Sequence, residues 1–320
     1  MSAALGGILD AERKALASAT GAPAIAPELL EKLGALGYVG GGGAAETATP
    51  GADPKDKVED FRIANDQVRE GLLRLHDRDY ARSVARFREV LAHRVSSFEV
   101  HFYLARALFA LRQNAEAAKH FEEAARRAPS HGPAWEGWAE SLAAAGQPER
   151  GLEVALRGQK VLPRSASLRA QEGALLEGLG RKAEARRAYE AALPLAPRNA
   201  RLRSTLGELL RGMGEIDEAI RRQREATELD PAVAGYWNSL GMTLGGNGRM
   251  AEAELAFREA CRRDDKSHLY AYNLGLILLR QGRPDESRPF FEDALRLNPQ
   301  FAPAHERLAE LRSASSRGAR

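Results

Sequence analysis

The chain has 320 residues, of which 44% are hydrophobic and 28% are charged, and its formal net charge is +3. A charge so close to balance, without a block of five basic residues, argues against a nucleic-acid partner, and no uninterrupted apolar run approaches the roughly 18 residues that a membrane span needs. The single cysteine, Cys261, excludes an intrachain disulfide and a cysteine-based zinc site. We therefore expect neither a cofactor nor a metal ion.

Residues 1–55 are predicted to combine a short helical segment with a linker. Asp10 and Glu12 interrupt the start before any apolar run long enough for a secretory signal, so we expect a cytoplasmic protein, or an extracytoplasmic one if the start is truncated. Residues 28–36 have an amphipathic pattern that is typical of a helix. Residues 40–54 are rich in Gly, Ala, Thr and Pro, which is typical of a linker, and no Gly-Lys-Ser/Thr follows to make a phosphate loop.

From Ala64 onward the sequence repeats every 34 residues without an insertion, in seven blocks that end at Phe301. We number the columns by the position within a block. Columns 8 and 20 always hold Gly, Ala or Ser, column 24 is mostly aromatic, and column 32 is mostly proline. Apolar residues recur at helical spacing between these columns, so each block predicts two antiparallel helices.

Each column has a physical role in this interpretation. Column 15 is glycine in blocks three to seven, which suits the left-handed turn that ends a first helix. Small residues at columns 8 and 20 let the two helices approach closely, and the aromatic at column 24 fills the gap to the next pair. Proline at column 32 ends the second helix. We expect no strand in residues 64–301, and helix breaks near Gly146, Gly180, Gly214, Gly248 and Gly282.

These columns resemble those of the tetratricopeptide repeat (TPR) family, and block six carries the resemblance best with Trp237, Leu240, Gly241, Leu244, Ala253, Phe257 and Ala260. The resemblance implies an all-α, right-handed superhelical array of antiparallel helix pairs that acts as a non-catalytic scaffold for a protein or peptide. The array is predicted over residues 56–312, with repeats at about 64–97, 98–131, 132–165, 166–199, 200–233, 234–267 and 268–301. A cap helix over 302–312 and a disordered tail over 313–320 follow.

A second resemblance precedes the repeats. Residues 27–43 and 52–61 resemble the end of the catalytic chain in bacterial sulfatase-type hydrolases that carry C-terminal TPR arrays. The nucleophile motif of that family, Cys or Ser followed by x-Pro-x-Arg, is absent from this sequence. The alternative function is therefore an accessory module of such a hydrolase, detached from its catalytic domain, and an amphipathic helix with a glycine-rich exit is an equally good interpretation.

The TPR resemblance places the partner-binding groove on columns 2, 5, 9 and 12 of the first helices. In blocks six and seven these columns predict an exposed apolar stripe with one amide: Asn238, Met242, Leu269, Tyr272, Leu276 and Leu279. Block two adds Phe102 and Arg106. A short amphipathic helix is the partner that fits such a stripe, unless the cap helix or the linker covers it. The mixture of Glu and Arg in the other blocks argues against RNA.

No catalytic set emerges from the remaining residues. His101 is predicted to be packed in the core, and Cys261 to be a buried, inert thiol. Arg169 and Glu172 occupy columns 4 and 7, which are usually apolar, and we interpret them as a structural ion pair. In block three the large residue is Trp138 at column 7 and the small one is Ala155 at column 24, so we expect the indole to fill the space of the missing aromatic.

Overall fold

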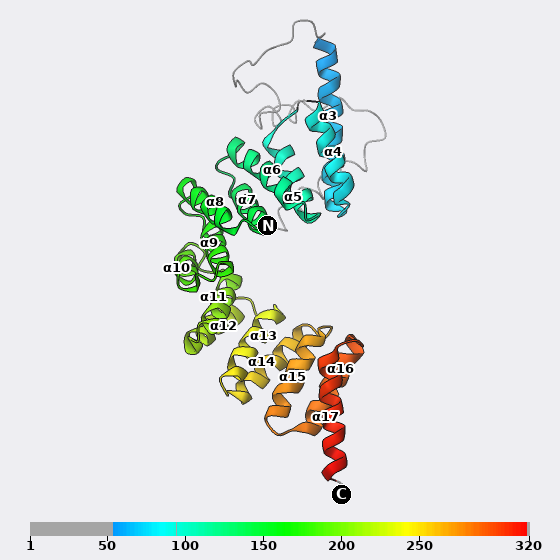
Figure 1. The fold of residues 1–320 in the computed structure, drawn as a ribbon, viewed down its shortest axis with the longest axis vertical. Helices are drawn as coiled ribbons and strands as arrows, with labels where there is room; N and C mark the ends of the chain where they lie inside the picture. The colour runs from blue at the N-terminus through cyan, green and yellow to red at the C-terminus, as the bar shows by residue number, and fades with distance from the viewer. Residues whose placement is uncertain (1–53, 94, 319–320) are drawn as a thin grey trace. The chain divides into compact units, whose positions relative to one another are not determined.

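The structure is built almost entirely of helices. The computed structural model describes residues 54–93 and 95–318, which form fifteen α-helices and one short 3-10 helix and include no β-strand (Figure 1). The prediction of an all-α fold is confirmed. The helical segment that we predict within residues 1–55 lies outside the described residues, as do nearly all of the linker and the segment 27–43 of the second resemblance.

The helices recur as antiparallel pairs at the predicted spacing. The second helix of one pair then packs on the first helix of the next, from α6 onward. The pairs are α3 (Pro54–His76) with α4 (Tyr80–Ala92), α5 (Phe98–Ala110) with α6 (Asn114–Arg127), α7 (Gly132–Ala144) with α8 (Pro148–Val161), α9 (Ala166–Gly178) with α10 (Lys182–Ala192), α11 (Ala200–Gly212) with α12 (Ile216–Leu229), α13 (Ala234–Gly246) with α14 (Met250–Arg263), and α15 (His268–Arg280) with α16 (Pro284–Leu297), followed by α17 (Ala302–Gly318).

The chain divides into two compact units, Met1–His101 and Phe102–Arg320. The first unit contains α3 and α4, where the Ser83 hydroxyl donates to the Gly71 carbonyl at 2.9 Å. The second unit contains α6 to α17, and Figure 1 shows its helices following one another from green to red. Two buried clusters near its C-terminal end hold side chains from consecutive helix pairs, so the core of this unit runs from pair to pair.

Each first helix ends in the left-handed turn predicted at column 15. The five glycines of blocks three to seven have φ angles between +74° and +84°. The next amide donates back to the carbonyl five residues earlier, as from Arg181 to Leu176 at 2.8 Å, which is the Schellman ending of a helix. Blocks one and two lack the glycine, and there Arg78 and Arg112 adopt φ angles of +62° and +60°. Blocks one and two therefore keep the left-handed turn, although a residue with a Cβ atom is strained at a positive φ.

The aromatic ring at column 24 packs over the small residue at column 8 of its own block. A Cβ atom at Gly173 would lie 2.6 Å from the ring of Tyr189, so only glycine fits beneath this ring. Phe257 also shares a buried cluster with Leu274 and Ile277 of the next pair. The expectation that the ring fills the gap between pairs is thus incomplete, because the ring also joins the two helices of its own pair.

Block five breaks this pattern. Gln223 occupies column 24 and is 1% exposed, with its side chain against Gly207. Neither its amide oxygen nor its amide nitrogen has a hydrogen-bond partner. A buried amide without partners costs roughly 1–3 kcal/mol of stability, so block five carries a penalty that its neighbours lack.

Proline ends most second helices as predicted, and one further proline shortens a helix. Pro129, Pro163 and Pro231 each lie two residues beyond the end of α6, α8 or α12. In block four Pro194 falls where the other second helices continue. It lacks the N–H that a helical bond needs, so α10 ends at Ala192 and a 3-10 turn, η1 (Leu193–Leu195), follows.

The C-terminal helix α17 covers the last repeat. Its Ala304, Leu308 and Leu311 lie in a buried cluster with Phe291 and Ala294 of α16, as expected for a cap helix. The helix continues to Gly318, into the tail that we expect to be disordered from residue 313. Residues 313–317 contain no glycine or proline that would end it.

In block three, Trp138 is 6% exposed and Ala155 is fully buried. Both must be buried if the Trp138 indole fills the space of the aromatic that is missing at column 24. The guanidinium of Arg157 on α8 lies 5.2 Å from the centroid of the Trp138 ring. That the indole replaces the missing aromatic stays a hypothesis. Removing the indole in Trp138→Ala should open a cavity and cost about 3–5 kcal/mol.

Candidate functional site

Polar contacts join neighbouring first helices along the predicted groove. Three side-chain hydrogen bonds connect consecutive first helices: Ser167 to Glu136, Ser239 to Glu208 at 2.7 Å, and Asn273 to Asn238 at 2.8 Å. They link α7 to α9, α11 to α13, and α13 to α15. The polar groove residues therefore hold the stack together, and Asn238 already accepts one hydrogen bond within the protein.

The predicted apolar stripe is only partly exposed. Met242 and Leu269 are 39% and 48% exposed. Tyr272, Leu276 and Leu279 are half-buried and pack against the cluster formed by α15, α16 and α17. The Tyr272 ring meets that of Phe301, which directly precedes α17, with 5.1 Å between centroids. The cap helix region thus covers part of the stripe, and Met242 and Leu269 are its accessible residues.

Phe102 and Arg106 lie far along the chain from this stripe, and Phe102 is not accessible. It is 9% exposed, and its ring packs edge-on against Phe121 and His131. Arg106 is half-buried, with its guanidinium 5.9 Å from the centroid of the Phe102 ring. Phe102 is therefore a core residue at a groove column.

The acidic residues of α7 influence each other. Glu140 reaches solvent, but protein atoms crowd its carboxylate, and this loss of hydration raises the pKa of Glu140 above its ordinary value. The negative charge of Glu136, one helical turn earlier, raises the pKa of Glu140 further, while Arg201 on α11 opposes the shift. This part of the groove columns therefore disfavours additional negative charge.

The predicted ion pair between Arg169 and Glu172 is wrong. The Arg169 guanidinium donates to the Pro163 carbonyl at 3.3 Å, and the Glu172 carboxylate accepts from the Gln159 amide at 2.9 Å. Both side chains turn toward the preceding second helix, α8, and its exit, and not toward each other. Arg203, which occupies the same column one block later, pairs with Glu225 at 3.0 Å.

Arg169 follows a rule that spacing alone does not reveal. In several blocks the side chain at column 4 donates to the carbonyl of the proline that ends the preceding block. The indole N–H of Trp135 donates to Pro129 at 2.9 Å, and that of Trp237 to Pro231 at 3.0 Å. Arginine at column 4 preserves this contact, because its N–H groups can replace the indole N–H.

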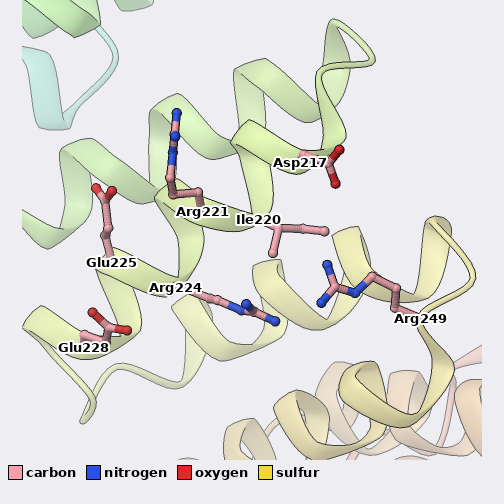
Figure 2. A pocket seen from close by; sticks show the side chains of 7 residues that line it. All are labelled: Asp217, Ile220, Arg221, Arg224, Glu225, Glu228 and Arg249. Carbon is pink, nitrogen blue, oxygen red and sulfur yellow. The ribbon is translucent and has the colours of Figure 1, made fainter.

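Two hollows open on the second-helix side of the array. The first lies between α12 and the start of α14, where the guanidinium groups of Arg224 and Arg249 approach each other beside Ile220 (Figure 2). Both arginines bind the carboxylate of Glu252. The lining as a whole is balanced, because Asp217, Glu225 and Glu228 stand against its three arginines. The second hollow lies between α8 and α10, over α9, and contains Arg169 and Glu172.

The described residues offer little reactive chemistry. No group of three or more His, Cys, Asp or Glu side chains within residues 54–93 and 95–318 could hold a metal ion. Cys261 is half-buried against the core, and burial raises the pKa of its thiol to about 11, so the thiol stays protonated near neutral pH. His101 is buried, as predicted. No helix of the described part is long and apolar enough to cross a bilayer.

The family comparison agrees with the column pattern. The family model described as tetratricopeptide repeat matches residues 68–132, 204–268, 244–302 and 272–312, which together cover more than half of the chain. No curated protein matches this chain at a significant level.

Solved structures resemble the chain at low sequence identity. The structure of the APC/C hetero-tetramer Cut9–Hcn1 has a TM-score of 0.56 and 17% identity over 80% of this chain and 46% of that one. YrrB, a TPR protein with an unusual peptide-binding site, has a TM-score of 0.49 and 20% identity over 59% and 97%. TTC0263, a thermophilic TPR protein in Thermus thermophilus, has a TM-score of 0.47 and 24% identity over 57% and 98%. Cut9–Hcn1 supports the fold alone.

Proposed function

Because the chain belongs to the tetratricopeptide repeat family, we propose that it is a non-catalytic scaffold that binds a protein or peptide partner on its first helices. The observation that carries this proposal is the exposure of two large apolar side chains, Met242 and Leu269, at groove columns of neighbouring first helices. Large apolar side chains that stay exposed in the folded chain are candidates for a binding surface.

The surroundings of these two residues favour a short amphipathic helix as the partner. Tyr272 and Leu276 lie half-buried on α15, the helix that carries Leu269, and extend the apolar surface. Methionine adapts its shape to an incoming apolar side chain, and apolar anchors spaced by one helical turn suit a helix that lies in a groove. The Asn238–Asn273 amide pair can meet the polar edge of such a helix.

A protein partner fits the charges of the first helices better than a nucleic acid does. Glu136, Glu140 and Glu208 alternate along the groove columns with Arg201 and Arg211. A phosphate backbone needs a basic stripe that is not interrupted by carboxylates.

The test combines photo-crosslinking with substitution in the full chain. A photoreactive phenylalanine analogue replaces Met242 or Leu269, and in a matched control it replaces Leu255 on α14, which is 65% exposed. In a lysate of the source cells we expect one protein to crosslink from positions 242 and 269 but not from 255. Met242→Lys with Leu269→Lys should weaken binding of that protein at least about tenfold, since buried apolar anchors dominate interfaces.

Leu255→Lys provides the matched substitution and should bind the partner like the unchanged chain. Because Met242 and Leu269 are exposed, the double variant should keep its helical circular dichroism and melting temperature. Equal crosslinking from all three positions, or unchanged affinity in the folded double variant, would refute the placement of the site.

The second candidate function, an accessory module of a sulfatase-type hydrolase, rests on residues 27–43 and 52–61. An upstream coding region with the nucleophile motif would favour it. The test is to purify the hydrolase encoded by such an upstream region and to measure whether it binds this chain. Met242→Lys with Leu269→Lys should then abolish that binding.

A further inference from the structure

The hollow between α8 and α10 is lined by both apolar and charged side chains. Its volume is about 390 Å³, near the small end of the range for ligand sites. Leu152 and Leu156 of α8 and Leu176 of α9 line its walls, and Leu156 is 40% exposed. Arg169 and Glu172 of α9 complete the lining on the same helix as Leu176.

The hollow follows from the residue types at columns 4 and 7 of block four. In block three these columns hold Trp135 and Trp138, whose side chains are each only 6% exposed. Arg169 and Glu172 replace such large apolar residues in block four and turn toward α8 and its exit. A guanidinium and a carboxylate do not pack as two indoles do, so the space between the second helices stays open.

The positive charge of this hollow is only partly matched. Arg181 pairs with Glu184, and Glu172 accepts from the neutral Gln159 amide. Arg187 has no ion pair within the described residues, and Arg169 reaches only the Pro163 carbonyl, with its Nε left without a partner. In the hollow between α12 and α14, by contrast, the carboxylates of Asp217, Glu225 and Glu228 balance the three arginines of the lining (Figure 2).

We propose that the hollow between α8 and α10 is a second docking site, separate from the groove, for a partner peptide that carries a carboxylate beside an apolar side chain. The apolar side chain enters between Leu156 and Leu176, where it removes exposed apolar surface from water. The Asp or Glu carboxylate accepts hydrogen bonds from Arg187 and Arg169. Arginine suits this role because its planar guanidinium can bind a carboxylate in a bidentate way.

The test uses random dodecapeptides displayed on phage and selected on the full chain. Peptides that also bind the variant Arg169→Gln with Arg187→Gln are removed by counter-selection, which discards those that bind the groove. The peptides that remain should carry Asp or Glu within two residues of Leu, Ile, Met or Phe. As synthetic peptides they should bind the double variant at least about tenfold more weakly than the unchanged chain.

Leu156→Glu is the second variant and does not depend on the partly buried Arg169. Leu156 is exposed, so its replacement should leave the fold intact while placing a negative charge in the hollow. We expect it to abolish binding of the selected peptides. The matched controls, Leu255→Glu on α14 and Arg221→Gln on α12, should bind them like the unchanged chain.

The outcomes separate this site from the groove. Binding that survives in Met242→Lys with Leu269→Lys and is lost in Leu156→Glu supports the hollow. Selection that yields no peptide specific for the unchanged chain, or peptides without a carboxylate, overturns the proposal. Peptides that lose affinity in the groove variant and keep it in Leu156→Glu also overturn it, but leave the groove function standing.

Discussion

Arg112 occupies a backbone position that blocks three to seven give to glycine. Its φ of +60° brings its Cβ atom into conflict with its own backbone, a strain of roughly 1–2 kcal/mol for residues other than glycine. Arg112→Gly removes that strain but also increases the entropy of the unfolded chain. We expect a net rise of about 0.5–1 kcal/mol in the free energy of unfolding, measured by urea denaturation.

The control for Arg112→Gly is Arg112→Ala, which removes the guanidinium and keeps the Cβ atom. It should be no more stable than the unchanged chain. Equal stability of the glycine and alanine variants would mean that the positive φ carries no cost at this turn.

Gln223 is another residue at which this chain departs from its own pattern. Its buried amide has no partners, and Gln223→Met replaces that amide with an apolar group of nearly the same shape. The free energy of unfolding should rise by about 1–3 kcal/mol. Thermal and urea denaturation of the purified variant would measure this change.

Gln159→Met is the matched control for Gln223→Met. The Gln159 amide donates to both the Leu168 carbonyl and the Glu172 carboxylate, so this variant should lose about 1 kcal/mol of stability. A destabilised Gln223→Met variant would indicate that a bound water already satisfies the Gln223 amide.

At the scale of elements, α7 carries two carboxylates one turn apart. The pKa of Glu140 is raised in the folded chain, so the folded state holds this proton more tightly than the unfolded state does. Ionised Glu140 therefore destabilises the fold at pH values above its folded pKa, and this penalty disappears below its unfolded pKa. At pH 7 the free energy of unfolding of Glu140→Gln should exceed that of the unchanged chain by about 0.2–0.5 kcal/mol. Its melting temperature should be higher accordingly.

The gain from Glu140→Gln should shrink as the pH falls toward 4, and melting curves across this range would follow it. Glu122→Gln, on the exposed face of α6, is the control and should not show the gain at pH 7. A Glu140→Gln advantage that stays constant down to pH 4 would contradict the raised pKa.

The helices and their turns could be predicted from the sequence because each depends on a local residue requirement that recurs every 34 residues. Glycine at column 15 and proline at column 32 act on their own backbone, so their positions predict the ends of helices directly. The shortening of α10 follows the same rule at Pro194, but this proline occurs once and lies outside the repeating columns. A pattern of columns predicts what recurs and misses such single changes.

The candidate site was harder to predict because it depends on contacts between helices. Column position alone suggests that Tyr272 and Leu276 are as exposed as Met242, yet they pack against the cluster that α17 completes. Helical spacing likewise suggests that Arg169 pairs with Glu172, whereas the preceding block offers each a nearer partner in Pro163 and Gln159. Spacing along one helix does not tell which neighbouring group competes for a side chain.

At the scale of the whole molecule, each helix pair of the second unit is stabilised by its contacts with the next pair. The ion pair between Arg186 of α10 and Glu215 at the start of α12, and that between Arg224 of α12 and Glu252 of α14, join consecutive pairs. Such exposed pairs contribute about 0–1 kcal/mol each, so the buried clusters between pairs carry most of the coupling. In an array of this kind each repeat is stabilised mainly by its neighbours.

The cap helix α17 is where this dependence can be tested, because the last repeat has α17 as its C-terminal neighbour. Deleting residues 302–320 removes Leu308 and Leu311 and exposes the side of Phe291 that they cover, at a cost of roughly 1.5–3 kcal/mol for each buried leucine. Hydrogen exchange measured by mass spectrometry should then show faster exchange in α15 and α16 and little change in α7 to α10. Deleting only residues 314–320, which keeps Ala304, Leu308 and Leu311 in place, should leave exchange in α15 and α16 as in the full chain. Equal loss of protection along the whole second unit would show instead that its repeats unfold as one cooperative block.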